Sequence, residues 1–216
     1  MGAGRWLDLD DWPPPALPHE WYLQADRVLA SEPTATAAAD SYFYDPIRPT
    51  PAVGGPLLNG AFGYDNRQLE ERPDVLTYTS APLDRDLTVI GAVDAELFVQ
   101  SSLACADFFV RLCDVEPDGR SLNVCDGITR MVDATWPACV RVELSETAYC
   151  FRRGHRLRLQ IASGAFPRFS RNLGTSEPLG EGRSMVGARQ TVLHGPAQPS
   201  RLRLSTVGTL GADDLL

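Results

Sequence analysis

The chain has 216 residues, of which 44% are hydrophobic and 22% charged, and its formal net charge is −8. This length and composition suit one large all-β domain or two small ones, with enough apolar residues for a sizeable core, and they exclude a mainly disordered chain. All 20 basic residues are arginines. The acidic excess argues against nucleic acid or an anionic membrane as the main partner.

The first residues lack the basic and then apolar pattern of a signal peptide, and no apolar run approaches the ~20 residues of a membrane span. The number of cysteines is odd, and none forms a C-x-x-C pair. They are Cys105, Cys113, Cys125, Cys139 and Cys150. We therefore expect a cytoplasmic protein whose cysteines are small buried side chains, with no metal site and no cofactor.

Residues 1–20 are expected to form an extended arm. Trp6, Trp12 and the run 13–15 of three prolines predict a partly polyproline segment whose aromatic rings dock on a neighbour. A strand is predicted at 41–44, whereas residues 46–66 are rich in Pro and Gly and should be irregular. The main domain is expected to cover residues 21–216.

From residue 74 onward the pattern is repeated alternation. Between Leu87 and Val99 every second residue is small or apolar, which predicts a half-buried strand that bends near Gly91. Similar alternation recurs at 108–112, 122–124, 140–144 and 157–161. The turn 116–119 predicts a hairpin because its Pro presets φ and its Gly accepts positive φ. Many such strands separated by turns predict an all-β, jelly-roll-like sandwich.

Five blocks of sequence are specific enough to compare with known families. They are DVLTYTSAPL at 74–83, LCDVEPDGR at 112–120, DGITR at 126–130, FRRGHRLR at 151–158 and SGAFPRFSRN at 163–172. In this order and spacing they resemble the C-terminal, non-catalytic domain of the cocaine esterase and X-prolyl dipeptidyl peptidase (CocE/NonD) family of serine hydrolases. The resemblance covers almost the whole chain.

The resemblance implies a jelly roll like that of galactose-binding domains, which packs on an α/β-hydrolase catalytic domain in cis or as a separate chain. Residues 1–20 would form the junction to that domain. In the family the catalytic Ser, Asp and His lie upstream of the point where this chain starts, so no catalytic residue is expected here. An apolar face near 1–20 and 50–65 is expected and, left uncovered, would favour a homo-oligomer.

The residues themselves also lack a serine nucleophile in the expected setting. A nucleophile elbow places Gly two residues before and after the Ser, and the nearest case, Ser184 after Gly182, has its second Gly one place late. His155 begins a predicted strand. It is either a general base paired to a carboxylate or a strand-end histidine that bonds a backbone group or carboxylate, and we favour the second. His19 and His194 are expected in solvated loops.

Four acidic residues are spread too loosely for a calcium loop and are expected to cap turns or pair with arginines. The acids are Asp107, Asp114, Asp118 and Asp126, and the arginines are Arg111, Arg130 and Arg168.

By resemblance, the loop after Gly54 and Gly55 brings Leu57 and Leu58 to the rim of the hydrolase's substrate pocket. Such an apolar wall would shield the reacting carbonyl from water. The alternative is a loop buried at the interface that does not touch substrate. Four further residues are candidates for interdomain contact, although the last two are equally compatible with internal packing. They are Trp6, Trp12, Phe166 and Arg168.

The parent reaction implied by the resemblance is acyl transfer from an ester or amide to a serine, followed by hydrolysis. A free-standing binding module, for example for carbohydrate, is the competing function, because jelly rolls often serve that role. Such modules usually expose a row of aromatic side chains on one sheet face. Two of the four tryptophans of this chain lie instead in the arm, at positions 6 and 12.

Overall fold

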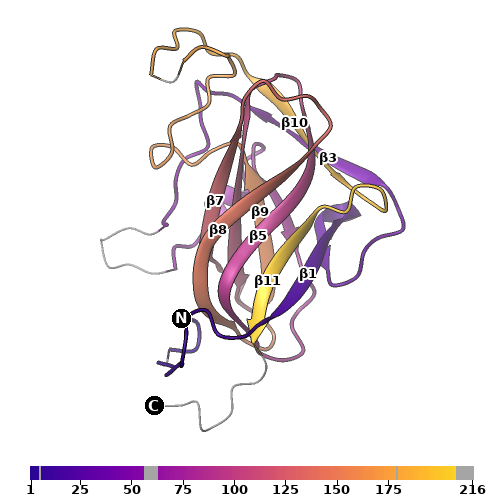
Figure 1. Ribbon diagram of the computed structural model, residues 1–216, viewed down its shortest axis with the longest axis vertical. Helices are drawn as coiled ribbons and strands as arrows, with labels where there is room; N and C mark the ends of the chain where they lie inside the picture. Colours follow the sequence, from indigo (N-terminus) through magenta and orange to yellow (C-terminus); the bar gives the residue numbers. More distant parts are fainter. Residues whose placement is uncertain (5, 56–62, 179, 208–216) are drawn as a thin grey trace.

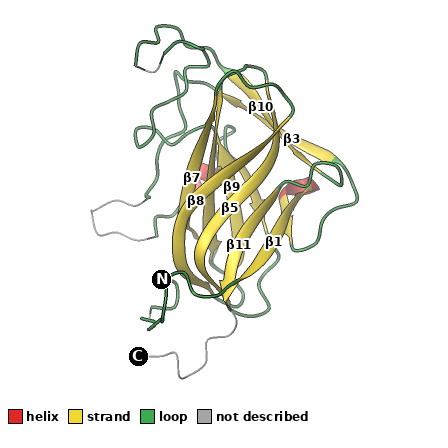
Figure 2. Cartoon of the chain, viewed as in Figure 1, coloured by secondary structure: helices red, strands yellow, loops and turns green. Residues whose placement is uncertain are grey.

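The computed structural model describes residues 1–4, 6–55, 63–178 and 180–207 (Figure 1). They form eleven strands: β1 (Leu17–Gln24), β2 (Val28–Ala30), β3 (Ala38–Tyr44), β4 (Leu76–Thr79), β5 (Leu87–Ser101), β6 (Ala106–Val115), β7 (Ser121–Met131), β8 (Ala138–Phe151), β9 (Arg156–Ala162), β10 (Ala188–His194) and β11 (Arg201–Val207). The helical segments are η1 (Ala25–Arg27) and α1 (Arg67–Glu70), and Figure 2 shows how little of the fold they occupy. Neither helix is long and apolar enough to span a membrane, and the described residues hold no other.

The strands form two layers, which confirms the expected all-β sandwich. In one layer the order is β3-β10-β5-β11-β1-β2, where β10 and β11 pair with successive stretches of one edge of β5 and β8 pairs with its other edge. The other layer has the order β4-β9-β6-β7, and a single parallel residue pair between β2 and β4 connects the two. All the other strand pairings are antiparallel. In the expected arm, β1 already begins at Leu17.

β5 is the longest strand and organises its layer. Its register against β8 shifts between Gly91 and Val93, and Gly91 has φ +106°, so the bend expected from the sequence is a β-bulge at this glycine. The inward side chains of β5 meet those of β6 and β9 in the main core, which includes Val93, Leu97, Val110 and Leu159. Alternation along the strands thus creates one apolar interior between the layers.

The turn 116–119 joins β6 to β7 as expected. The amide of Gly119 donates to the carbonyl of Glu116 over 2.8 Å, and Gly119 has φ +89°. Glycine adopts this φ without the clash that a Cβ would cause, so the tight hairpin forms at little cost.

β6 is buried along its whole length, on both faces. On the outer face a second, smaller core forms where Phe109 and Ala162 pack against Leu69, Val75 and Ala165. These partners come from the excursion between β3 and β4 and from the segment that follows β9. Ala52 and Val53, from the region 46–66 that was expected to be irregular, also pack against this core, so the described part of that region helps to cover the second layer.

The free edges of the two layers meet where β7 and β8 lie side by side (Figure 1). The hydroxyl of Thr129 donates to the carbonyl of Arg141 over 2.9 Å. Gly127 lies so close to β8 that a Cβ built on it would be 1.9 Å from the carbonyl oxygen of Glu143. The close approach of the two strands therefore depends on the missing side chain at this position.

We predict that Gly127→Ala lowers the stability of the chain by about 1–3 kcal/mol, because the new methyl group must push two backbones apart. The matched control is Gly164→Ala, since a Cβ there meets no atom within 4 Å. Urea unfolding of both variants checks the prediction. Equal midpoints for the two would contradict it.

Candidate functional site: the arm and the β7–β8 edge

The start of the arm extends the edge of β8. The main-chain nitrogen of Met1 donates to the carbonyl of Ala148 over 2.6 Å, and the amide of Cys150 donates to the carbonyl of Met1 over 3.1 Å. A Cβ on Gly2 would lie 2.2 Å from the carbonyl oxygen of Cys150, so this close contact requires glycine. The first residues of the arm therefore attach to β8 by backbone hydrogen bonds.

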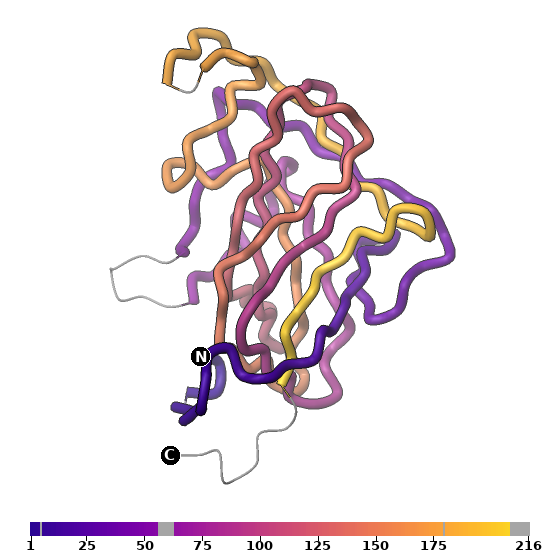
Figure 3. The backbone as a smooth tube through the Cα atoms, viewed as in Figure 1, coloured from indigo at the N-terminus to yellow at the C-terminus, as the bar shows by residue number. Residues whose placement is uncertain are grey.

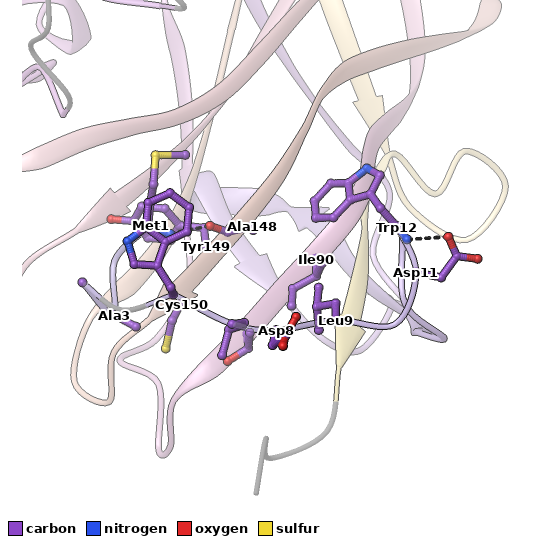
Figure 4. Close-up of a pocket in the computed structure, with 14 residues that line it drawn as sticks. Met1, Ala3, Asp8, Leu9, Asp11, Trp12, Ile90, Ala148, Tyr149 and Cys150 are labelled. Carbon is purple, nitrogen blue, oxygen red and sulfur yellow. Dashed lines mark hydrogen bonds between the residues drawn. The ribbon is translucent and has the colours of Figure 1, made fainter. Parts of the chain in front are cut away.

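Further along, the arm crosses the outer face of β5 and β8, as the indigo tube in Figure 3 shows. The indole nitrogen of Trp12 donates to Glu146 over 3.0 Å, and Pro13 lies against the bulge at Gly91. Ile90 is fully buried although it does not belong to the core between the layers. The arm provides its cover, since Leu9 and Ile90 line one cavity and lie close together in Figure 4.

A cavity of about 720 Å³ lies between the arm and the two strands (Figure 4). Its lining is mostly apolar and includes Leu9, Ile90 and Tyr149. At its rim Trp6 is 87% exposed and Trp12 is 48% exposed. Large apolar side chains left uncovered around a cavity are typical of a surface that another protein domain covers.

A second cavity, of about 490 Å³, adjoins the first and shares Met1 and Tyr149 with it. It runs between β7 and β8 and reaches Gly55 and Gly63, the residues on either side of the segment 56–62. Together the two cavities form a strip from the arm to this loop, which we call the edge strip. Leu57 and Leu58, the expected pocket-rim residues, lie outside the described residues.

The stems of this loop are held against β7. Gly54 has φ +62°, and a Cβ on it would clash with the ring of Tyr64. On the other stem, the amide of Tyr64 donates to the side-chain oxygen of Asn123 over 2.8 Å, and the amide of Asn66 donates to the carbonyl of Ser121 over 2.7 Å. Both ends of the loop are thus fixed at the border of the second cavity.

Asp65 reinforces the second stem. Its carboxylate accepts hydrogen bonds from the Arg67 guanidinium and from the amide of Ser121. The bonds from Arg67 are the main reason that the pKa of Asp65 is lowered to about 2. The ionised carboxylate is therefore retained well into the acidic range.

Beneath the loop stems lies a buried charge cluster. Arg111 is 0% exposed and Asp126 is 2% exposed, and two guanidinium nitrogens of Arg111 donate to one oxygen of Asp126 over 2.9 and 3.2 Å. The third donates to the side-chain oxygen of Asn66 over 2.7 Å. Arg168 donates to the other oxygen of Asp126 over 2.5 Å. The cluster therefore links β6, β7 and both segments that cover the second layer.

The expected pairing of acids with arginines is confirmed for all three predicted arginines. Besides the two partners of Asp126, Arg130 binds Asp107 through two nitrogens, over 2.7 and 2.8 Å. Asp118 pairs with Arg120 in the hairpin turn.

Phe166 is 39% exposed and lies under the guanidinium of Arg171. The interdomain contacts expected of Trp6, Trp12, Phe166 and Arg168 stay predictions, although Arg168 is already bonded to Asp126 within the chain.

His155 bonds a carboxylate, as the favoured interpretation predicted. Its Nδ1 lies 2.9 Å from Asp114, which also accepts a hydrogen bond of 3.0 Å from the Tyr149 hydroxyl. Burial, together with the negative charge of Asp114, raises the pKa of Tyr149. Within the described part of the chain, no hydroxyl or thiol is hydrogen-bonded to His155 that it could activate. The pair orients Tyr149, which lines both cavities of the edge strip.

The expectation that His194 is solvated is wrong, since this residue is only 2% exposed. It ends β10, and its Nε2 lies 3.1 Å from Asp40, which also accepts a 2.7 Å hydrogen bond from the Tyr78 hydroxyl. Burial alone would raise the pKa of Asp40, but the hydrogen bonds with Tyr78 and His194 outweigh it and lower the pKa. His19 lies in β1 and not in a loop.

Ser184, at the centre of the elbow-like sequence, is exposed in the connection between β9 and β10. No strand runs into it, so the strained strand-to-helix turn of a nucleophile elbow is not formed there. Four of the five cysteines are buried as expected, whereas Cys139 is exposed. Groups of three or more metal-ligating side chains are absent from the described ranges.

Sequence reasoning missed two contacts that shape this surface. Asn66 completes the shell of Arg111, and Glu146 fixes Trp12. In both pairs the partners are far apart in sequence and follow no motif, so no local signal could have paired them.

The chain is similar in sequence to a known protein family and to a known esterase. Over residues 1–203 the chain matches the family described as X-Pro dipeptidyl-peptidase C-terminal non-catalytic domain. It is 34% identical to the cocaine esterase of Rhodococcus sp. (strain MB1 Bresler), over 96% of this chain and 41% of the relative.

Two solved structures are also similar. One is an alpha-amino acid ester hydrolase, with TM-score 0.86 and 29% identity over 95% of this chain and 40% of that one. The other is an aminopeptidase from a marine sediment Thaumarchaeota archaeon, with TM-score 0.83 and 28% identity over 96% of this chain and 40% of that one. The chain thus spans about two fifths of the length of these relatives.

We predict that Arg111→Gln destabilises the chain by about 1–3 kcal/mol. The change removes two of the three guanidinium hydrogen bonds that the Asp126 carboxylate accepts and leaves the Asn66 oxygen without its donor, while Arg168 still supplies a counter-charge. The control is Arg120→Gln, which removes a half-exposed arginine from the hairpin turn and should change stability by less than about 1 kcal/mol. Urea unfolding measures both. Losses of similar size would show that the buried cluster is dispensable.

Proposed function

Because this chain belongs to the family of X-Pro dipeptidyl-peptidase C-terminal non-catalytic domains, we propose that it packs on an α/β-hydrolase domain and helps to wall that domain's acyl pocket. The chain itself is the accessory part of such an enzyme. The proposed catalytic partner lies in cis or in a separate chain.

One observation carries the proposal. The edge strip is a continuous, largely apolar hollow that begins at the exposed tryptophans of the arm and ends at the fixed stems of the loop 56–62. Both regions were expected at the interface from sequence alone. A hydrolase domain seated on the strip would bury Trp6 and Trp12 and would meet the loop that carries Leu57 and Leu58.

In this proposal the hydrolase domain supplies the serine, histidine and acid, and the reaction is acyl transfer from an ester or amide to the serine, followed by hydrolysis. The accessory domain contributes apolar side chains that exclude water from the reacting carbonyl. The proposed setting is the cytoplasm, where reducing conditions suit five cysteines that are all free thiols. Without its partner, the same strip would favour a homo-oligomer.

The alternative function is a free-standing carbohydrate-binding module. The positions of the tryptophans do not support it, because none of the exposed ones belongs to a strand. Trp21 and Trp136 pack against the core, and the indole nitrogen of Trp136 donates to the carbonyl of Leu103 over 2.8 Å. The exposed tryptophans belong to the arm. A row of exposed aromatic side chains on one sheet is what such a module would need.

We predict that the purified chain alone neither hydrolyses a short-chain nitrophenyl ester nor reacts with a serine-directed phosphonate. Mass spectrometry of the treated chain detects any adduct. Turnover together with stoichiometric labelling of one serine would mean that this sandwich holds its own active site.

In the complete enzyme, we predict that Leu58→Asp raises KM or lowers kcat without changing the thermal midpoint, because a carboxylate replaces part of an apolar pocket wall. Met185→Asp introduces the same charge at an exposed apolar residue between β9 and β10, and it should leave both constants unchanged. Identical kinetic constants for the two variants would show that Leu58 does not form part of the pocket wall.

A further inference from the structure

The buried cluster of Arg111, Asp126 and Arg168 contains two guanidinium groups and one carboxylate. Each carboxylate oxygen is already used, since one accepts from Arg111 and the other from Arg168. The cluster therefore holds one surplus positive charge, shared between the fully buried Arg111 and the partly exposed Arg168.

Three nearby acids do not neutralise this charge, because each binds an arginine of its own. Glu70 pairs with Arg158 over 2.5 Å, and Asp107 and Asp65 pair with Arg130 and Arg67. Glu146, which lines the same cavity as Asp126, accepts instead from the indole nitrogen of Trp12 and forms no ion pair with Arg168. The only ion pair of Arg168 to a described side chain is the one with Asp126. The loop 56–62 reads PLLNGAF and contributes no acid either.

Of the two arginines, only Arg168 is accessible. Its side chain is 20% exposed, whereas that of Arg111 is 0% exposed. Gly55 lies against its guanidinium, and a Cβ there would come within 2.6 Å of Nη1. Gly55 and Asp126 both line the second cavity of the edge strip, so the surplus charge lies directly behind this part of the strip.

The guanidinium of Arg168 is also held in a fixed orientation. Its central carbon lies 4.7 Å from the centre of the Phe169 ring, and Nη1 is anchored on Asp126. Its Nε and Nη2 make no further hydrogen bond to a described residue. An arginine fixed by stacking, with donors left over, suits a second carboxylate because the planar fork matches its two oxygens.

We propose that Arg168 binds a carboxylate side chain of the hydrolase domain, which completes the cluster when that domain seats on the edge strip. The inference rests on the proposed function, and it assigns to the hydrolase domain one carboxylate side chain at the contact with Arg168. The charge balance explains why a protein acid fits here, since one added negative charge makes the cluster neutral.

The first test uses the isolated chain with ¹⁵N-labelled arginine and sodium acetate as the probe. We expect a saturable shift of the Arg168 Nε resonance in the millimolar range, which sodium chloride at equal ionic strength does not produce. The resonance is identified by its loss in Arg168→Gln. Arg120, already paired with Asp118 and Glu116, serves as the internal control and should not respond. The absence of a saturable shift at Arg168 overturns the inference and leaves the proposed function, tested through Leu58, untouched.

The second test repeats the titration in the complete enzyme and identifies the source of the carboxylate. We expect the acetate response to fall at least tenfold, because a hydrolase side chain already occupies the site. An undiminished response means that the hydrolase supplies no carboxylate here and that Arg168 binds free carboxylates instead, which overturns the proposal.

The variant Arg168→Gln separates recognition from a merely structural role. In the isolated chain it should leave the thermal midpoint unchanged, because Arg111 still neutralises Asp126 and the surplus charge is gone. In the complete enzyme it should shorten the half-life of thermal inactivation several-fold, and Arg168→Lys should restore part of it. A lowered midpoint in the isolated chain with an unchanged half-life in the enzyme contradicts the proposal.

Discussion

The buried ion pair between Arg111 and Asp126 is the interaction on which the functional surface depends. It lies on the outer face of the second layer, where the excursion between β3 and β4 and the segment after β9 both close over β6. Through Asn66 and Arg168 the pair reaches both covering segments. A buried ion pair is seldom a large net source of stability, but removing one partner is severe, so the pair fixes the position of the segments that it joins.

That fixed position sets the geometry of the edge strip. The loop stems lie against β7, the arm lies against β8, and the two strands approach closely at Gly127. The arm and the loop stems are far from these two strands in sequence, yet each is tied to a strand edge by backbone hydrogen bonds and by a glycine contact. Such a surface is largely preformed for a partner, which reduces the ordering cost of association.

Much of this fold could be predicted from the sequence, because strand alternation and turn chemistry are local signals. The alternation from Leu87 to Val99 and the turn at 116–119 were sufficient to locate β5 and the β6–β7 hairpin. Arg111 shows the limit of such signals. It alternates with Val110 and Leu112 and would be placed in solvent, but a covering segment buries it.

His194 was misplaced for the same reason, since Asp40 and Tyr78 reach it from other strands. The sequence was enough to predict that the acids pair with arginines. It could not show that two arginines share Asp126, because that depends on which residues meet in the folded chain.

The double burial of β6 has a consequence for the order in which the molecule opens. Every residue of this strand is buried, both of its edges are paired, and each of its faces lies in a separate core. Fraying from either end cannot reach its amides without first removing the hairpin partner or the covering segments. The amide protons of β6 should therefore exchange only through global unfolding, and the strand would be the last ordered element to remain.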